Sequence, residues 1–386
     1  MDLPSATPPH RADRRSLSDR LQLAAVRLIA RLPDRIKISL SGEPAIVIDG
    51  QQLDPQAQFL RSVRRRRVTC GLLEPSLDAG RRRYRRQAVL FRGPTTPVGA
   101  VLDFEIPAGD HQIAVRHYAP PGRGAANAPL LVYFHGGGFV IGDLETHDAL
   151  CRILCRAACT HVLSVAYRLA PEHPFPAALD DAQFAFRWAL ANAGRLGADP
   201  ARVAVGGDSA GGNLSAVVSL LERGERPPAA QLLIYPSTDA AGSRLSHERF
   251  DAGFALTRND CRAFFRSYTG HRRVDIADPR ISPLRAVSHA NTPPALVAVA
   301  GFDVLRDEGE AYAEVLEAAG TIVRLQRFPS LEHGFVHSVG VCPAAHRAVM
   351  EIGRAWRDLI EGVASPQPVA SAAGRIGGPE RSALRP

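Results

Sequence analysis

The sequence lacks several features that would by themselves define a class of protein. Its six cysteines in 386 residues are too few for a disulfide scaffold. It contains no run of about 18 apolar residues free of charge, so a membrane-spanning helix is not predicted. The 30 prolines and 33 glycines follow no collagen-like period. With 45% hydrophobic and 22% charged residues, the chain is expected to fold around one large core or two modest ones.

Positive charge is concentrated in one stretch. Between Arg61 and Arg92, eleven arginines stand against only Glu74 and Asp78, so the net charge of +8 belongs to this segment and the rest is nearly neutral. The segment contains only two aromatic residues, and we do not predict a nucleic-acid partner. We interpret it as a solvated, ion-paired connector, with weak association with an anionic membrane surface as the alternative.

The two ends of the chain have the composition of disordered tails. Residues 1–16 are rich in proline and polar side chains, and residues 363–386 are similar. Between them, the first apolar pattern places Leu21, Ala25, Leu28 and Leu32 on one face of a helix. We predict an amphipathic helix that packs this face on the body of the protein. The alternative is a helix that lies on a membrane surface.

From about Gln112 onward, apolar strands and helices alternate, which predicts an α/β protein with a mostly parallel sheet flanked by helices. The stretch from Asp239 to Leu284 interrupts this rhythm with no evident strand, and we predict an insertion above the sheet. The predicted strands are Gln112–Tyr118, Leu130–Phe134, Val162–Tyr167, Val203–Val205, Gln231–Tyr235, Ala295–Val299 and Thr321–Phe328. The predicted helices are Thr146–Ala158, Ala178–Leu190, Asn213–Arg223, Asp307–Ala319 and Ala344–Ile360.

The strongest local signal for chemistry is Gly207-Asp208-Ser209-Ala210-Gly211, between a predicted strand and a predicted helix. A Gly-x-Ser-x-Gly in this context is a nucleophile elbow, which holds a serine hydroxyl clear of the sheet on a strained turn. The flanking glycines remove side chains that would collide at such a turn. The alternative is a glycine-rich turn that closes an ordinary strand.

A second signal is His135-Gly136-Gly137-Gly138, directly after a predicted strand. Consecutive glycines allow backbone N–H groups to approach a developing oxyanion without obstruction. The alternative, a phosphate-binding loop, lacks the lysine and the helix-opening glycine pattern that such loops require. The run precedes Ser209 in the chain, as the oxyanion loop of an α/β-hydrolase does.

A serine nucleophile needs a base and a group that orients the base. Asp303 follows the strand ending at Val299, and His333 follows the last predicted strand. The order Ser, Asp, His matches the α/β-hydrolase arrangement. Asp307 is the competing acid, but it falls inside the next predicted helix, so we favour Asp303.

Two other patterns suggest metal sites and fail closer inspection. His337 follows His333 by four residues, but position 334 is not a glutamate, so the His-Glu-x-x-His zinc pattern is missing. Cys151, Cys155 and Cys159 repeat every four residues on one predicted helix face without the spacing of a zinc or redox site. We interpret the cysteines as small buried side chains.

Taken together, five segments resemble the hormone-sensitive-lipase-like branch of the α/β-hydrolase carboxylesterases. They are HGGGFVIGDLETHD, YRLAPEHPFPAALDD, GDSAGGN, GFDVLRDEG and LEHGF, in this order from about Val132 to Phe335. The segment LEHGF departs from the family pattern, which usually has an apolar residue before the histidine. Here Glu332 adds a charge beside His333.

The resemblance implies an α/β-hydrolase fold with a helical cap, and it implies a role for each site residue. Ser209 is the expected nucleophile, His333 the base and Asp303 the acid of a catalytic triad. The expected oxyanion donors are the backbone N–H groups of Gly137, Gly138 and Ala210, whereas His135 is expected to be structural. No cofactor or metal is implied. We divide the chain into residues 17–90, an N-terminal cap and basic connector, and residues 91–362, a catalytic domain with a cap insertion at about 239–284.

The implied activity is hydrolysis of small-molecule carboxylic esters, with short to medium acyl chains, through an acyl-enzyme intermediate. The alternatives are an amidase with the same triad and a non-catalytic ligand-binding protein of the same fold, such as the plant gibberellin receptors, which resemble these esterases but lack the catalytic histidine. We expect a cytoplasmic monomer or homodimer. Four phenylalanines of the insertion either line the acyl pocket or anchor the insertion to the cap: Phe250, Phe254, Phe264 and Phe265.

Overall fold

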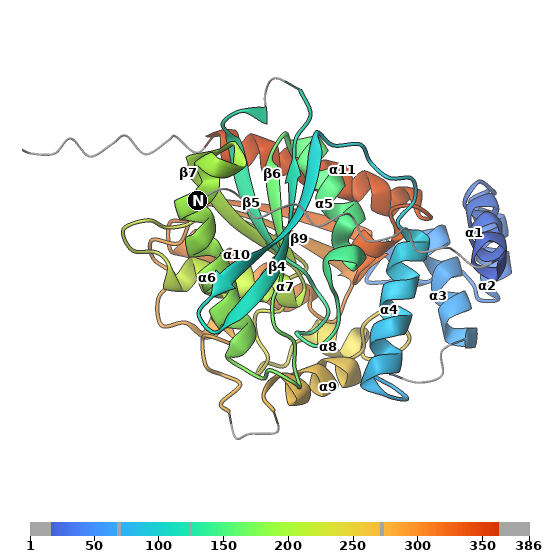
Figure 1. Cartoon of the computed structure of the whole chain (residues 1–386). Coiled ribbons are helices and arrows are strands. Elements are labelled where there is room, and N and C mark those ends of the chain that lie inside the picture. The colour runs from blue at the N-terminus through green and yellow to red at the C-terminus, as the bar shows by residue number, and fades with distance from the viewer. Residues whose placement is uncertain (1–16, 68–70, 123–124, 271–273, 363–386) are drawn as a thin grey trace, which may run out of the picture.

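A computed structural model describes residues 17–67, 71–122, 125–270 and 274–362 of the chain. Both predicted disordered tails lie outside these residues. An eight-stranded twisted sheet forms the centre of the molecule, with strand order β10-β9-β8-β7-β5-β6-β4-β3 (Figure 1). The strands are β3 (Ala100–Ala108), β4 (His111–Ala119), β5 (Ala128–Phe134), β6 (His161–Ala166), β7 (Ala198–Asp208), β8 (Gln231–Ile234), β9 (Ala295–Phe302) and β10 (Val323–Glu332).

The sheet is parallel from β10 through β6, and only β4 runs against its neighbours β6 and β3. Buried apolar side chains cover both faces of the central strands, as a sheet covered on both sides requires. Along β9, Leu296 and Ala298 join one core cluster, whereas Val297 and Val299 join another on the opposite face. The predicted α/β architecture is confirmed.

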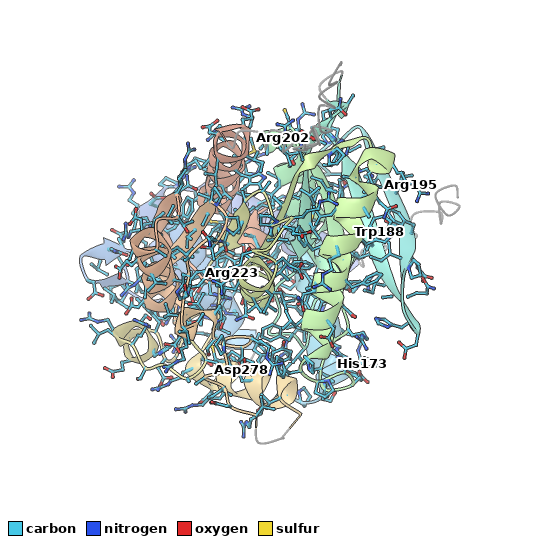
Figure 2. All side chains as sticks on the ribbon, turned by 90° about the vertical axis from the view of Figure 1, so that its left-hand side faces the viewer. His173, Trp188, Arg195, Arg202, Arg223 and Asp278 are labelled. Atoms are coloured by element: carbon cyan, nitrogen blue, oxygen red, sulfur yellow. The ribbon has the colours of Figure 1, made fainter. Side chains whose placement is uncertain are left out.

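Five helices cover the two faces of the sheet. Helices α5 (Leu144–Ala158) and α11 (Pro343–Gly362) pack together in one core cluster. The other face is covered by α6 (Ala177–Asn192), α7 (Ala210–Leu221) and α10 (Arg306–Ala318). Trp188 of α6 packs against the edge strand β3, with its ring centroid 5.8 Å from that of Phe104 (Figure 2).

The edge strand β3 is an element that the sequence analysis missed. Among the described strands it pairs only with β4, so one side of its backbone is hydrogen-bonded to the sheet. Its residues alternate between buried and exposed, and Pro107 lies near its end. This edge position explains why β3 has no continuous apolar run of the kind that marked the central strands.

Within the described residues, four helices and a small hairpin precede the sheet. The helices are α1 (Leu17–Ala30), α2 (Asp34–Ser41), α3 (Pro55–Arg67) and α4 (Leu77–Phe91). Strands β1 (Val47–Ile48) and β2 (Gln51–Gln52) are joined by Asp49-Gly50, both with positive φ, as a two-residue hairpin of this type requires. None of the described helices has the length and apolarity needed to cross a membrane.

The first helix forms as predicted, but the prediction of which face it buries was wrong. Leu23 and Val26 are buried against Leu90, Phe91 and Val341. The predicted buried face, which includes Leu21 and Leu28, is exposed to solvent. The helix is apolar on two sides, and periodicity alone does not say which side meets the body.

The predicted insertion contains α8 (Leu245–Arg249), α9 (Arg258–Tyr268) and the short helix η3 (Pro283–Arg285), and its described residues form no strand. Asn213 of α7 fastens this segment to the body, because its side-chain amide donates to the carbonyl groups of Ser237 and Ile281. Helix α9 lies at the same end of the molecule as the lower part of α4 (Figure 1).

Candidate active site

Ser209 lies on the sharp turn between β7 and α7. Its φ of 54° falls in the left-handed region, which is strained for a residue with a side chain. The turn is possible because Gly207 and Gly211 have no side chains. Both lie so close to the carbonyl group of Phe134 that neither position has room for a Cβ atom. The backbone N–H of Ser209 donates to Ile234 of the neighbouring strand at 2.9 Å. The predicted strand–turn–helix context of the motif is present.

The structure brings Ser209, His333 and Asp303 into one hydrogen-bonded chain. Oγ of Ser209 is 3.1 Å from Nε2 of His333, and Nδ1 of His333 is 2.7 Å from Oδ2 of Asp303. Asp303 follows the end of β9 and His333 follows the end of β10, so two adjacent parallel strands deliver both side chains to the same edge of the sheet. The Asp303 carboxylate also accepts the N–H of Leu305 at 2.9 Å, which restrains its rotation. Asp307, the competing candidate, binds Ser246 and Arg306 instead.

The glycine loop 136–138 lies next to this chain. Gly137 and Gly138 have φ values of 119° and 61°, conformations that L-residues rarely adopt. A Cβ atom on Gly138 would collide with the ring of Phe264. Ala210, the third predicted oxyanion donor, is the first residue of α7, where backbone N–H groups are free of helical partners. All three predicted donors line the same pocket as Ser209.

Asp208, the residue before Ser209, ties the glycine loop to the elbow, and the sequence analysis gave it no role. Its buried carboxylate accepts the N–H of Gly136 at 2.9 Å and the hydroxyl of Tyr133 at 2.7 Å, with the Tyr235 hydroxyl at 3.4 Å. His147 lies 3.1 Å from the same carboxylate. Burial alone would raise the pKa of Asp208, but the nearby His147 and these hydrogen bonds hold it well below its usual range.

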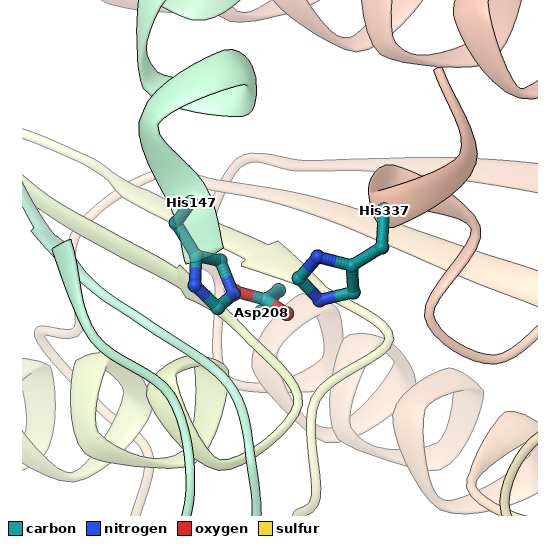
Figure 3. Close-up of side chains that lie close together, drawn as sticks. All are labelled: His147, Asp208 and His337. Atoms are coloured by element: carbon teal, nitrogen blue, oxygen red, sulfur yellow. The ribbon is translucent and has the colours of Figure 1, made fainter. Parts of the chain in front are cut away.

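Three side chains from distant parts of the sequence meet here: His147 from α5, Asp208 from β7 and His337 from the short helix η4 (Phe335–Ser338; Figure 3). Their possible ligand atoms lie within 4.8 Å of one another, which is compatible with a metal ion. However, the Tyr84 hydroxyl binds Nε2 of His337 at 2.7 Å, and Asp208 is already hydrogen-bonded. Burial lowers the pKa of His337 to about 3. We therefore interpret the cluster as a hydrogen-bond network that positions the loop.

His135, expected to be structural, is buried and stacks on the ring of Tyr167 with centroids 4.3 Å apart. Its Nδ1 is 2.8 Å from the carbonyl oxygen of Gly136. Burial, with a further contribution from His147, lowers the pKa of His135 to about 4. A neutral, buried ring in these contacts holds the start of the glycine loop.

Glu332, the charge beside His333, binds a partner from the N-terminal helices. Both of its oxygens accept from the guanidinium of Arg64 on α3, at 3.1 and 3.0 Å. The N–H of Ala255, in the insertion, donates to the same carboxylate at 3.1 Å. One side chain therefore joins β10, α3 and the insertion directly beside His333.

A largely apolar pocket opens above Ser209 and His333. Two segments far apart in the sequence, the N-terminal helices and the insertion, contribute to the lining together with residues around Ser209. The N-terminal helices and the segment that joins them contribute Ala57, Leu60, Arg64, Leu72, Tyr84, Gln87 and Ala88. The insertion contributes Ala255, Leu256, Cys261, Phe264 and Phe265.

The four phenylalanines divide between the two expected roles. Phe264 and Phe265, on α9, line the pocket. Phe250 and Phe254 pack instead against each other and against Phe302 at the end of β9, with ring centroids 5.4 to 5.8 Å apart. The first pair therefore meets whatever occupies the pocket, and the second pair anchors the insertion to the sheet domain.

The interpretation of the three cysteines as buried holds for two of them. Cys151 and Cys155 are buried inside α5. Cys159 is exposed, because the helix ends at Ala158 and Cys159 takes a left-handed conformation at its C-cap. The repeat of four residues therefore extends one position beyond the helix that it predicts.

The fold and this arrangement of serine, histidine and aspartate define a class, the α/β-hydrolases. A family model for the alpha/beta hydrolase fold matches residues 131–337. The carboxylic ester hydrolase LipN of Mycobacterium tuberculosis is 48% identical over 81% of this chain and 84% of its own length. The ethyl acetate hydrolase of Pseudomonas putida is 37% identical over 71% of this chain and 88% of its own. The chain therefore belongs to the hormone-sensitive-lipase-like family of α/β-hydrolase esterases.

Solved structures agree with this assignment. An ester hydrolase from the metagenome of Lake Arreo is 39% identical, with a TM-score of 0.74 over 79% of this chain and 99% of its own. A hyperthermophilic esterase from the archaeon Pyrobaculum calidifontis is 36% identical, with a TM-score of 0.72 over 78% of this chain and 97% of its own.

Proposed function

We propose that the protein is a serine carboxylesterase in which Ser209, His333 and Asp303 form the catalytic triad. The observation that carries this proposal is the hydrogen-bonded chain from the Ser209 hydroxyl through the imidazole of His333 to the buried carboxylate of Asp303. The family relationship supports it, because relatives spanning most of this chain are named as ester hydrolases.

In the first half of the reaction, His333 takes the proton of Ser209 while the hydroxyl oxygen attacks the ester carbonyl carbon. Asp303 holds the imidazole in the correct tautomer and stabilises the imidazolium that forms. The C–O bond to the alcohol then breaks, and His333 protonates the leaving oxygen. Water attacks the acyl-enzyme by the same route, which releases the acid and restores Ser209.

The negative charge on the carbonyl oxygen develops next to the glycine loop. We assign its stabilisation to the backbone N–H groups of Gly137, Gly138 and Ala210. Each donor in such a hole contributes on the order of 3 kcal/mol to the stability of the transition state. Asp208 positions this hole, since it holds the N–H of Gly136 and directly precedes the nucleophile.

The substrates that fit this pocket are small, mostly apolar esters with short to medium acyl chains. Its lining is mainly apolar, and the charges of Arg64 and Glu332, which both line it, neutralise each other. We propose that residues 17–90 and the insertion at 239–284 act together as the cap. We also propose that the protein works in the cytoplasm as a monomer or homodimer. The free thiols of the five described cysteines suit a reducing compartment.

The test is hydrolysis of p-nitrophenyl esters of graded acyl length by the wild type, Ser209→Ala and the control Ser338→Ala. Ser338 also lines the pocket, but it is not hydrogen-bonded to His333. We expect Ser209→Ala to lower kcat by at least about 10³-fold and Ser338→Ala to stay within a few-fold of the wild type. A fluorophosphonate should label Ser209 in the wild type. Full activity in Ser209→Ala, or labelling of another serine, would refute the proposal.

A further inference from the structure

The outward face of α1 is an apolar surface that no described part of the chain covers. Leu17, Leu21 and Leu28 are 74%, 63% and 64% exposed. Their spacing of four and seven residues places them on one face of the helix, together with the exposed Ala24. We call these four residues the leucine stripe. On the opposite face of α1, Leu23 and Val26 are buried against Leu90 and Phe91 of α4 and against Val341. This packing holds the helix with the stripe facing solvent.

Positive charge without an internal partner lies beside the stripe. Arg27 lies in the last turn of α1, Arg31 directly follows the helix, and Arg35 lies in α2. The side chains of these three arginines have no ion pair or hydrogen bond with any described residue. Residues 1–41 contain eight basic and four acidic residues.

The acidic residues of the same two helices are already neutralised. Asp19 pairs with Arg86 of α4 at 2.6 Å, and Asp34 pairs with Lys37 at 2.9 Å. Charge at this surface is therefore set by the free arginines.

The arginine-rich stretch behaves differently, although its sequence carries more positive charge. Arg64 binds Glu332, and Arg81 binds Glu172 through two hydrogen bonds of 2.7 and 2.8 Å. Arg85 binds Asp143 at 2.9 Å. Eight of the ten arginines in this stretch whose side chains the structure describes have a hydrogen-bond partner, and four of the eight hold the N-terminal helices to the insertion or the sheet domain. The surface suited to an anionic partner is α1, at the outer edge of the molecule with α4 between it and the sheet (Figure 1).

We propose that α1 docks the protein on an anionic lipid bilayer, with the leucine stripe inserted into the acyl boundary and Arg27, Arg31 and Arg35 at the headgroups. A helix of 14 residues is about 21 Å long and carries the three features of an interfacial helix: an apolar face, flanking arginines and no length to span. Each basic side chain near an anionic surface adds to the attraction.

A second copy of this chain is the less suitable occupant. A two-fold interface built on the stripe would bring two sets of the same three unpaired arginines toward each other. The three leucines also offer much less area than the about 800 Å² per partner of a stable dimer interface. An anionic bilayer satisfies both the apolar face and the charge.

The experiment is flotation of the full-length chain with vesicles of phosphatidylcholine alone or with 30% phosphatidylglycerol. Ser209→Ala is the parent, so that the lipid esters are not consumed. We expect binding to the anionic vesicles, weaker at 0.5 M than at 0.05 M NaCl. The stripe variant Leu17→Gln/Leu21→Gln/Leu28→Gln and the charge variant Arg27→Gln/Arg31→Gln/Arg35→Gln should each lower the partition coefficient at least tenfold.

The matched control replaces three leucine-sized exposed apolar residues elsewhere, Leu245→Gln/Val287→Gln/Ile322→Gln, which are 62%, 104% and 66% exposed. This variant should partition like the parent. When the stripe substitutions are made in the chain that retains Ser209, the variant should hydrolyse a soluble ester at the wild-type rate. That result would show that the variant folds. The proposal is overturned if the parent does not bind anionic vesicles or if the control loses binding equally. A concentration-dependent dimer that the stripe substitutions abolish would instead assign the stripe to a second copy.

Discussion

Single side chains around His333 leave its ring little freedom. Asp303 is held in place by its hydrogen bond from Leu305 while it binds Nδ1 of His333 at 2.7 Å. The ring of Tyr235 packs against the imidazole with centroids 4.6 Å apart. In the proposed mechanism the orientation of the imidazole decides whether Nε2 can take the serine proton, so we expect these contacts to affect the rate more than substrate binding.

Asp303→Asn should lower kcat by about 10³- to 10⁴-fold with little change in KM, because an amide cannot stabilise the imidazolium and favours the wrong tautomer. Asp307→Asn is the matched control, since it is the same change four residues later on a carboxylate that binds Ser246 and Arg306. Steady-state kinetics on a p-nitrophenyl ester measure both. Equal losses in the two variants would contradict the assignment of Asp303.

The pairing of Arg64 with Glu332 leads to a prediction about the rate. Arg64→Gln removes the two hydrogen bonds that join α3 to the residue before His333, so we expect kcat/KM for a p-nitrophenyl ester to fall roughly tenfold. The control Arg65→Gln removes a more exposed arginine that binds Glu43, and it should leave kcat/KM close to the wild-type value. An unchanged kcat/KM in Arg64→Gln would show that this pair does not help to position His333.

At the scale of elements, the pocket depends on segments that are far apart in the sequence. Helix α3 reaches Glu332 through Arg64, helix α4 reaches His337 through Tyr84, and α9 places Phe264 over the glycine loop. Asp208 holds the glycine loop because its carboxylate accepts the N–H of Gly136. The three residues that we propose as the triad directly follow strands of the sheet, whereas the shape of the pocket is set by helices added around it.

Phe265→Ala should shift the acyl-chain preference toward longer p-nitrophenyl esters, because Phe265 lines the pocket and its removal enlarges it. Phe250→Ala, in the same insertion, should leave the preference unchanged. It should instead destabilise the protein by about 3–5 kcal/mol, since Phe250 is fully buried against Phe254 and Phe302. Ratios of kcat/KM across chain lengths, together with urea unfolding, separate the two effects. A shifted preference in Phe250→Ala alone would contradict this division.

The whole molecule buries several histidines that must stay neutral. Burial lowers the pKa of His117 and His337 to about 3 and that of His135 to about 4, from an ordinary value of 6.5. At a pH between the folded pKa values of about 3 to 4 and the ordinary value of 6.5, the unfolded chain binds more protons than the folded one. Stability is therefore complete above about pH 6.5 and decreases as the pH falls toward the folded values.

Urea unfolding at pH 5.0 should accordingly show a lower midpoint than at pH 7.5, with a loss of up to about 2 kcal/mol for each of these histidines. His117→Gln should reduce the difference between the two pH values, because it removes one of the buried rings. The exposed His173→Gln serves as the control and should keep the full difference. Equal midpoints for the wild type at both pH values would contradict the prediction.

Much of this protein follows from local sequence. Apolar runs and helical periodicity predicted the central strands, and the motifs around Ser209, Asp303 and His333 named residues that the structure brings within hydrogen-bond distance. Their catalytic roles stay predictions. This success has a physical cause, since a buried parallel strand must be apolar and a side chain that follows it must lie at the edge of the sheet.

Other features depend on contacts that no local pattern encodes. Edge strand β3 lacks the continuous apolar run of a buried strand, so periodicity does not predict that it pairs with β4. Helix α1 is apolar on two sides, so periodicity does not predict which face is buried. Asp208, His147 and His337 meet only because β7, α5 and η4 converge (Figure 3). The sequence by itself determined the strands, helices and reactive residues through local hydrophobicity and turn chemistry. Tertiary structure alone decided which faces are covered, which charges are paired and how the pocket is walled, because those depend on packing between distant segments.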